Sequence, residues 1–381
     1  MSNMHNGKLH LPHLSITNFQ GIRRLSIDRL GRVTLITGLN GVGKTTVLDA
    51  VRVYATRGDQ DVLRELLYSR EEFVDALDED RDLVISPDYK ALFFGRHPTP
   101  DQAISIGPAS DQDCLKIKAI DVKDLPEPQQ GLFYKLNSEA NQALSIVYRD
   151  AESVLPWLAD ATGLSEHHLF RHVPRTLRRM ELSRQDMPDP VNCESLGPGL
   201  LKNHMLANFW DKIVLTPQET LALQALSLTG QKIDRIAVIG EDSRRLSRLG
   251  RRIAVKMSDQ AQPVPLKSLG DGITRLFAVG LALAASHNGF LVIDEVENGI
   301  HFYVQEDFWL MILKAAKEYN VQVLATTHSF DCIKAFSRAA SKIQDSQGAL
   351  IRLEGENGDI RAIEYNEEYL KIASDQGIEV R

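Results

Sequence analysis

One short stretch of the chain reads Gly38-Leu39-Asn40-Gly41-Val42-Gly43-Lys44-Thr45. It matches the pattern G-x-x-x-x-G-K-[ST] at every fixed position. The glycines of this pattern let consecutive backbone amides turn inward around phosphate groups, the lysine reaches the outer phosphates, and the hydroxyl binds Mg²⁺. The pattern has this meaning only between a strand and a helix, so the flanking sequence determines whether it applies.

The sequence on both sides of this loop supplies the required context. Residues 32–37 form a β-rich run that leads into the glycines, and apolar residues recur at helical spacing from 45 to 54. A helix that begins at the loop points its positive end at the phosphates. We therefore predict a strand, a phosphate loop and a helix, with ATP as the ligand. The predicted nucleotide ligands here are Gly38, Asn40, Gly41, Gly43, Lys44, Thr45 and Thr46.

Two carboxylates follow the apolar strand predicted at 290–293. Asp294 would bind Mg²⁺ through its water shell, together with the threonine of the loop. Glu295 would lie on the opposite side of the pleat and could orient and deprotonate the attacking water. A further apolar strand at 321–326 precedes His328, which can reach the γ-phosphate region. The predicted catalytic residues are Lys44, Glu295 and His328, and the predicted magnesium ligands are Thr45 and Asp294.

A second anion-binding helix end is predicted upstream of the two carboxylates. The helix expected at 273–286 is opened by Leu266-Lys267-Ser268-Leu269-Gly270-Asp271-Gly272. Its first amides would point toward an anion, as the amides after the phosphate loop do. The further nucleotide ligands proposed from this segment are Ser268, Gly270, Gly272 and Arg275.

This order of segments resembles the ABC-type ATPases, specifically the SMC/RecF/OLD-like group found in DNA repair and phage defence. Asn18-Phe19-Gln20-Gly21 is similar to that group's Asn-Phe-Arg-Gly opening. Residues 294–301 are similar to its Asp-Glu-Ile-Glu-Asn-Gly-Leu-His segment, and Thr327-His328-Ser329 matches its switch histidine. The resemblance covers about residues 9–60 and 205–335.

The resemblance implies a head-to-tail homodimer with two ATP molecules between the subunits. Gly270–Gly272 and Arg275 would then act in trans. Gly270 stands where the group has its signature serine, so either Ser268 or backbone amides alone make the γ-phosphate contact. The sequence does not place the glutamine that usually ligates magnesium, for which Gln102 is one candidate. We therefore expect slow hydrolysis.

Alternating apolar strands and helices predict an α/β fold with a covered sheet. The resemblance implies an ABC-type head with a mixed or parallel sheet and an antiparallel N-terminal β lobe. We expect an N-terminal lobe at 1–120, a mostly helical insertion at 121–206 and a C-terminal lobe at 207–381. Prolines and short length argue against a long coiled coil in the insertion. Further predicted elements are a helix within 61–82, strands at 91–96, 104–120, 234–240 and 252–257, and a helix at 303–319.

Composition limits the partners of the chain. With 381 residues, 43% apolar residues and a net charge of −7, it has no global electrostatic footprint for nucleic acid. Two arginine clusters, within 171–184 and 244–252, could bind DNA, pair with the acidic stretch at 71–82 or dock another subunit. Metal binding by His167, His168 and His172 is disfavoured. Three separated cysteines and no long apolar run predict a soluble, cytoplasmic protein.

The OLD-family nucleases fuse this kind of ATPase to a Toprim nuclease domain. The segment after His328 lacks an Asp-x-Asp motif and is too short for such a domain. The chain therefore resembles the stand-alone ATPase components of two-gene defence systems such as PARIS or Septu. We expect an ATP-driven sensor or scaffold that controls a separate effector, for example a Toprim-type nuclease. The alternative is a DNA-repair ATPase that clamps duplex DNA directly.

Overall fold

The fold is built around one large mixed β-sheet. The computed structural model describes residues 8–77, 83–99, 102–109, 111–127, 130, 142–157, 187–199, 201–240 and 251–365. Within these residues, twelve strands follow the order β10-β14-β15-β3-β16-β17-β2-β1-β6-β7-β8-β9. A three-stranded and a two-stranded antiparallel sheet lie apart from it. No helix in this described part is long and apolar enough to cross a bilayer.

Five neighbouring strands of the large sheet run parallel and carry the phosphate loop and the two carboxylates at their ends. Their buried apolar runs are typical of strands covered on both faces. In one of them, Leu291 and Ile293 face one hydrophobic core, while Phe290 and Val292 face the other. The five strands are β10 (Cys193–Leu196), β14 (Phe290–Ile293), β15 (Gln322–Thr326), β3 (Val33–Gly38) and β16 (Gly348–Glu356).

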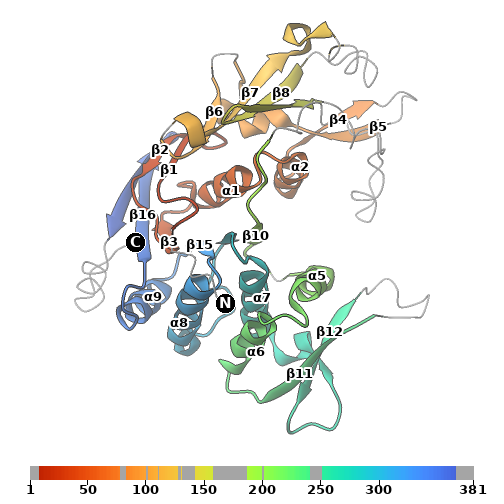
Figure 1. Ribbon diagram of the computed structural model, residues 1–381, viewed down its shortest axis with the longest axis vertical. Coiled ribbons are helices and arrows are strands. Elements are labelled where there is room, and N and C mark those ends of the chain that lie inside the picture. The colour runs from red at the N-terminus through yellow and green to blue at the C-terminus, as the bar shows by residue number, and fades with distance from the viewer. Residues whose placement is uncertain are drawn as a thin grey trace.

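Helices cover both faces of this parallel part (Figure 1). On one face lie α1 (Lys44–Ala55) and α2 (Gln60–Ser69). On the other lie α7 (Asp271–Ala285), α8 (Phe302–Glu318) and α9 (Phe330–Ser341), with α5 (Asn203–Ile213) and α6 (Glu219–Ser227) packed against α7. The predicted covered α/β sheet is therefore confirmed.

The rest of the large sheet is mainly antiparallel and curves over α1 and α2 in Figure 1. Those of its strands that lie between residues 14 and 121 come from the N-terminal part of the chain, as the predicted β lobe requires. The strand at the junction comes from the C-terminal part and was not predicted. These strands are β17 (Asp359–Tyr365), β2 (Ile22–Ile27), β1 (Leu14–Phe19), β6 (Ile104–Gly107), β7 (Leu115–Asp121), β8 (Gln142–Tyr148) and β9 (Ala151–Pro156).

The region expected to be a helical insertion is extended wherever the structure describes it at length. Within 121–206, β8 pairs with β7 and β9, and β10 pairs with β14 at the far edge of the sheet. Four consecutive residues of β8, 143–146, are buried, which fits a strand covered on both faces. The helical interpretation is wrong for these residues, and 158–186 lie outside the described part. The domain boundaries themselves stay a prediction.

Two short predicted elements also differ. The predicted helix within 61–82 ends at Ser69, and β4 (Phe73–Leu77) pairs with β5 (Leu83–Pro87) as a hairpin. The predicted strand at 91–96 consists of two 3₁₀ turns, Tyr89–Leu92 and Phe94–Arg96. Asp88 accepts a hydrogen bond from the amide of Lys90 and so favours the first turn.

The smaller three-stranded sheet extends from the helical side of the molecule (Figure 1). It contains β11 (Ile233–Ile239), β12 (Arg252–Met257) and β13 (Val264–Pro265). The first two strands agree with the predicted ones. The third leads through a 3₁₀ turn at Leu266–Leu269 into α7, so this sheet adjoins the predicted second anion-binding segment.

Candidate nucleotide-binding site

The loop between β3 and α1 depends on glycine at two crowded positions. Gly38 has φ of 139° and Gly43 has φ of 103°, a region that L-residues rarely adopt. A Cβ at Gly38 would also lie 2.5 Å from the carbonyl oxygen of Leu353 in β16. At Gly43 it would lie 3.0 Å from the side chain of Ile360 in β17. The C-terminal hairpin therefore supports the loop from behind.

The first turn of α1 is available to an anion. Among the described residues no side chain caps this helix at Gly43, so its N-terminal amides and positive dipole end are free to bind one. Lys44 Nζ donates to the carbonyl oxygens of Gly38 at 2.8 Å and Leu39 at 2.9 Å. Burial lowers the pKa of Lys44, and neighbouring carboxylates oppose that shift. The two hydrogen bonds place the Lys44 amine inside the loop, where phosphate groups would bind.

Asp294 connects the end of β14 to the phosphate loop. Thr45 Oγ1 donates to Asp294 Oδ2 at 3.0 Å, and the hydroxyl of Thr326 donates to Asp294 Oδ1. Hydroxyl and carboxylate oxygens are ligands that Mg²⁺ accepts, usually completed by waters and substrate phosphates. Thr45 and Asp294 therefore fit a magnesium ion beside a bound triphosphate, as the sequence predicts.

Glu295 is directed by a sharp turn of the backbone. Its φ is 46°, in the left-handed region, and its amide donates to Thr326 Oγ1 at 2.8 Å. Asn298 Nδ2 donates to Glu295 Oε2 at 2.5 Å. We predicted that strand pleating directs Asp294 and Glu295 to opposite sides. This explanation is wrong, because β14 ends at Ile293, before both residues. Non-glycine residues in this conformation cluster at functional sites.

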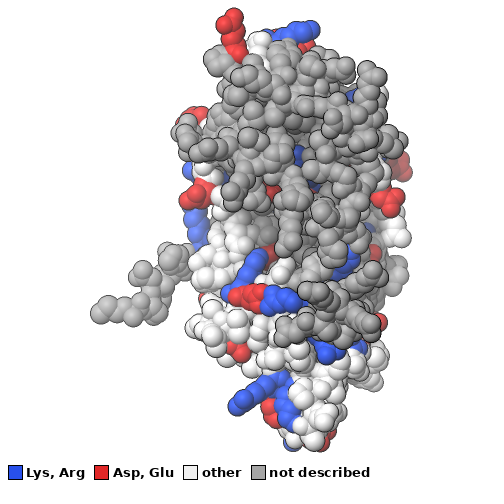
Figure 2. Space-filling model, turned by 90° about the vertical axis from the view of Figure 1, so that its right-hand side faces the viewer, with Lys and Arg blue, Asp and Glu red and all other residues white. Residues whose placement is uncertain are grey.

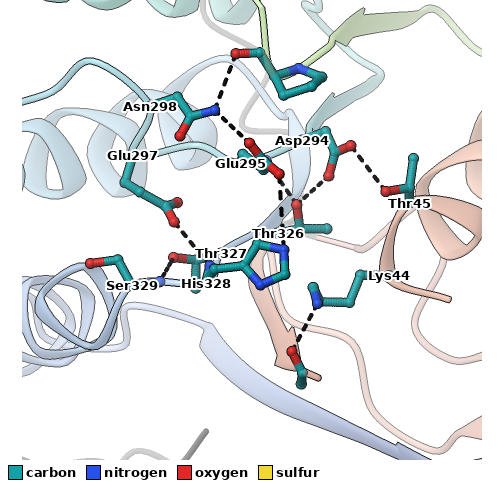
Figure 3. A network of polar contacts seen from close by, with 12 residues as sticks. Lys44, Thr45, Asp294, Glu295, Glu297, Asn298, Thr326, Thr327, His328 and Ser329 are labelled. Atoms are coloured by element: carbon teal, nitrogen blue, oxygen red, sulfur yellow. Dashed lines mark hydrogen bonds and ion pairs between the residues drawn. The ribbon is translucent and has the colours of Figure 1, made fainter. Parts of the chain in front are cut away.

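His328 lies across from Glu295 at the end of the next strand (Figure 3). Its Nε2 is 4.0 Å from Glu295 Oε1. Its backbone amide donates to Glu297 Oε1 at 2.9 Å, and the following Ser329 caps α9 through the amide of Cys332. The histidine is therefore placed beside the carboxylate that would activate water.

These groups surround a cavity of about 670 Å³. Ligand sites commonly have this size. The cavity is lined by the phosphate loop, with Lys44, and by several residues of the segment 294–301 after β14, which we call the acidic loop. Asp294 does not line the cavity but accepts a hydrogen bond from Thr45, which does. The lining residues are Asn40, Gly41, Gly43, Lys44, Thr45, Thr46, Arg70, Glu295, Glu297, Asn298 and His328.

The segment before α7 does not line this cavity. Ser268 and Gly270 are exposed, and Gly270, with φ of 104°, precedes the first residue of α7. Gly272 lies against the backbone of the acidic loop, since a Cβ there would be 2.4 Å from the carbonyl oxygen of Gly299. A role of Ser268, Gly270 and Gly272 in binding nucleotide in a second copy stays a prediction.

Arg275 is buried, which corrects the expectation that it contacts nucleotide in trans. Only 2% of its surface is exposed. Its guanidinium donates to the carbonyl oxygens of Gly197 at 2.6 Å, Asp294 at 2.9 Å and Glu295 at 3.3 Å in its own chain. Arg275 therefore holds the end of β10 to the end of β14.

Comparisons with known proteins match the parts of the chain that contain this site. A family model described as "AAA domain, putative AbiEii toxin, Type IV TA system" matches residues 228–331, and an AAA-domain model matches 13–76. An uncharacterized protein of Methanocaldococcus jannaschii, MJECL11, is 34% identical over 115 residues, which are 30% of this chain and 99% of that protein. Two parts of the chain, residues 13–76 and 228–331, are therefore similar to AAA-domain families. The two family models together include the phosphate loop, both carboxylates and His328.

Other similar proteins match most of the chain. An ATP/GTP phosphatase of Helicobacter pylori is 21% identical over 352 residues, covering 84% of this chain and 85% of that protein. A solved SMC head bound to the C-winged helix domain of ScpA covers 94% of this chain and 98% of that chain, with 13% identity and a TM-score of 0.46. The SMC head domain from Thermotoga maritima has 14% identity and a TM-score of 0.42, covering 94% and 100%.

The structure adds residues of the ATPase site that sequence reasoning did not identify. Arg70 follows α2, lines the cavity and pairs with Asp49 of α1. Thr326 forms hydrogen bonds with both Asp294 and Glu295, although its place at the end of an apolar strand was the only sequence signal. The candidate magnesium glutamine Gln102 is exposed and not part of the cavity.

Of the two predicted arginine clusters, the structure describes Arg251 and Arg252. Most of both arginine clusters, and His167, His168 and His172, lie outside the described residues. Arg251, which is described, pairs with Asp211, with NH2 to Oδ1 at 2.7 Å. On the face in Figure 2, described basic and acidic side chains are interspersed. Among described residues no cluster of three or more His, Cys, Asp or Glu could hold a metal.

Replacing Arg275 with methionine should lower the free energy of unfolding by about 3 kcal/mol, because several buried carbonyl oxygens lose a charged donor. Urea denaturation followed by circular dichroism measures this. Arg338→Ala, at an exposed position of α9, is the control and should change stability by less than about 0.5 kcal/mol. An Arg275 variant as stable as this control would contradict the structural role.

Proposed function

We propose that this chain binds ATP with Mg²⁺ and hydrolyses it slowly to ADP and phosphate. The observation that carries the proposal is the convergence of Lys44, the Thr45–Asp294 pair and the Glu295–His328 pair on one cavity. The Helicobacter pylori relative, which is named an ATP/GTP phosphatase, supports it. Phosphate release by the purified chain with ATP and Mg²⁺ is the direct test, and no release above background would overturn the proposal.

Each residue has one role in this proposal. Lys44 and the amides at the start of α1 bind the outer phosphates, and Thr45 with Asp294 holds Mg²⁺, which neutralises the developing charge. Glu295 accepts the proton of the attacking water. His328, whose Nε2 lies 4.0 Å from Glu295 Oε1, contacts the γ-phosphate. Asn298 keeps the Glu295 carboxylate in place by its hydrogen bond.

Two copies of the chain would complete two sites in a head-to-tail dimer. The exposed segment before α7, which contains Ser268 and Gly270, does not line the cavity of its own chain, which supports its use by another. Exposed apolar side chains also support it: Leu39 in the phosphate loop is 77% exposed, and Phe302 and Tyr303 are 54% and 78% exposed. Aromatic side chains such as Phe302 and Tyr303 are enriched at protein interfaces.

Ser268→Glu should prevent ATP-dependent dimerisation, because its carboxylate would oppose the triphosphate of the second copy. Light scattering with and without ATP measures the oligomeric state, and equilibrium binding shows that each copy still takes up ATP. Ser341→Glu, at the exposed C-terminal end of α9, is the matched control and should still dimerise. If Ser268→Glu dimerises as the control does, the trans contact is wrong.

We also propose that the dimer controls a separate effector in defence against phage. The description of the matched family, which names a toxin–antitoxin system, supports a second component. ATP binding would close the dimer and hydrolysis would open it, so the effector is retained in only one of the two states.

A further inference from the structure

The acidic loop after β14 carries a carboxylate, Glu297, that the hydrolytic mechanism does not use. We propose that Glu297 is a positioning residue that holds the backbone at His328 and thereby keeps the imidazole facing Glu295. The proposal rests on the proposed ATPase function, and it assigns to Glu297 a role within its own chain. Its evidence is the contact between two loops that are adjacent only in the folded protein.

The backbone around Val296 fixes the direction of Glu297. Val296 is fully buried, and its amide donates to the carbonyl oxygen of Thr326 at 3.0 Å. Glu295 has already turned the chain through its left-handed conformation. The next side chain, Glu297, therefore points to the junction of β15 and α9, where its Oε1 accepts the amide of His328 at 2.9 Å (Figure 3).

The amide of His328 lies between two amides that have acceptors in or next to their own strand, whereas its own acceptor comes from the acidic loop. The preceding amide, of Thr327, donates to the carbonyl oxygen of Ile36 in β3 at 3.0 Å. The following amide, of Ser329, donates to Thr327 Oγ1 at 3.0 Å. Neither the strand ladder nor the helix provides an acceptor for His328 N–H, and Glu297 does. A hydrogen bond to a charged acceptor is stronger than one between neutral groups.

This contact fixes the relative position of two predicted catalytic side chains. Asn298, next in sequence, holds Glu295 Oε2 at 2.5 Å, and Glu295 Oε1 faces His328 Nε2 at 4.0 Å. Glu297 thus holds the backbone of His328, and its neighbour Asn298 holds the carboxylate of Glu295. Misplacing a catalytic group by about 1 Å can cost about 100-fold in rate.

The second oxygen of Glu297 argues against a role in stability alone. Oε2 is buried and has no hydrogen-bond partner among the described residues. An unpaired buried polar atom costs free energy, which the single bond to His328 N–H does not fully offset. Glutamine keeps an oxygen acceptor for the amide and removes the charge, whereas alanine removes the acceptor.

The first experiment compares ATP turnover in Glu297→Ala, Glu297→Gln and wild type. Glu297→Ala should lower kcat by about 10- to 100-fold and change KM by less than about threefold, because Lys44 and the α1 amides that bind the phosphates are unaltered. Glu297→Gln should recover most of that loss. Glu318→Ala, an exposed position of α8, is the control. Equal loss in both Glu297 variants, or none in Glu297→Ala, would overturn the proposal.

The second experiment measures the contact without activity. Hydrogen exchange of short peptides containing His328 should be at least about tenfold faster in Glu297→Ala than in wild type, and nearly unchanged in Glu297→Gln, since a broken hydrogen bond exposes the amide. Unchanged exchange in Glu297→Ala would refute the proposed role of the hydrogen bond between Glu297 and the His328 amide. If wild type hydrolyses no ATP, the proposed function fails while this exchange result still tests the contact.

Discussion

Glu295→Gln should lower the rate of ATP hydrolysis by about 100- to 10,000-fold, while ATP still binds. An amide cannot accept the proton of the attacking water, but its oxygen can still accept the hydrogen bond from Asn298. The loss should therefore appear in kcat alone. Because hydrolysis no longer opens the dimer, this variant should accumulate as an ATP-bound assembly.

Single-turnover phosphate release and light scattering test both parts of this expectation. Glu318→Gln, on the exposed surface of α8, is the matched control and should hydrolyse ATP as wild type does. Turnover within about tenfold of wild type in Glu295→Gln would remove Glu295 from its assigned role. A protein that co-purifies with the ATP-bound variant would be the candidate effector.

Lys44→Ala should weaken ATP binding by at least about 100-fold. The lysine is buried, and its Nζ atom already lies against the loop carbonyls, so binding a phosphate there requires little rearrangement. Removing a charged donor from such a site costs about 1.5 to 3 kcal/mol for each hydrogen bond. The ATP-dependent dimer should be lost as well.

Isothermal titration calorimetry with ATP and Mg²⁺ measures this change. Lys314→Ala, at an exposed position of α8, is the control and should bind ATP normally. The folded state of both variants is checked by thermal unfolding. Unchanged affinity in Lys44→Ala would mean that the phosphate loop is not the nucleotide site.

The sequence predicts those parts of the site that depend on neighbours along the chain. The phosphate loop is a local structure, because its glycines, Lys44 and Thr45 act through backbone turns and one helix end. The strand before Asp294 is all apolar and short, so its end could be located. The covered sheet follows from the same apolar runs.

Arg275 shows where this reasoning fails. Its partner carbonyls at Gly197 and Gly199 are 78 and 76 residues away along the chain, so no local pattern indicates them. A resemblance transfers a role to a position, but it does not show which face of the helix is buried. The same limit applies to Arg70, whose place in the cavity depends on the packing of α2 against α1.

The extended part of 121–206 was misassigned for a different reason. Prolines near the strands interrupt the pattern, and β8 is almost continuously apolar, which is compatible with either a buried helix or a covered strand. The pairing with β7, which selects the strand, is a contact between distant segments. β16 and β17 were missed although they support the phosphate loop.

The close approach of Gly272 to Gly299 leaves no space for even one methyl group between the start of α7 and the acidic loop. Tightly packed segments transmit displacement instead of absorbing it. Pressing α7 toward the loop must therefore move the backbone that carries Glu295, Glu297 and Asn298. A partner that binds the exposed start of this helix would therefore change the position of the catalytic residues in the same chain.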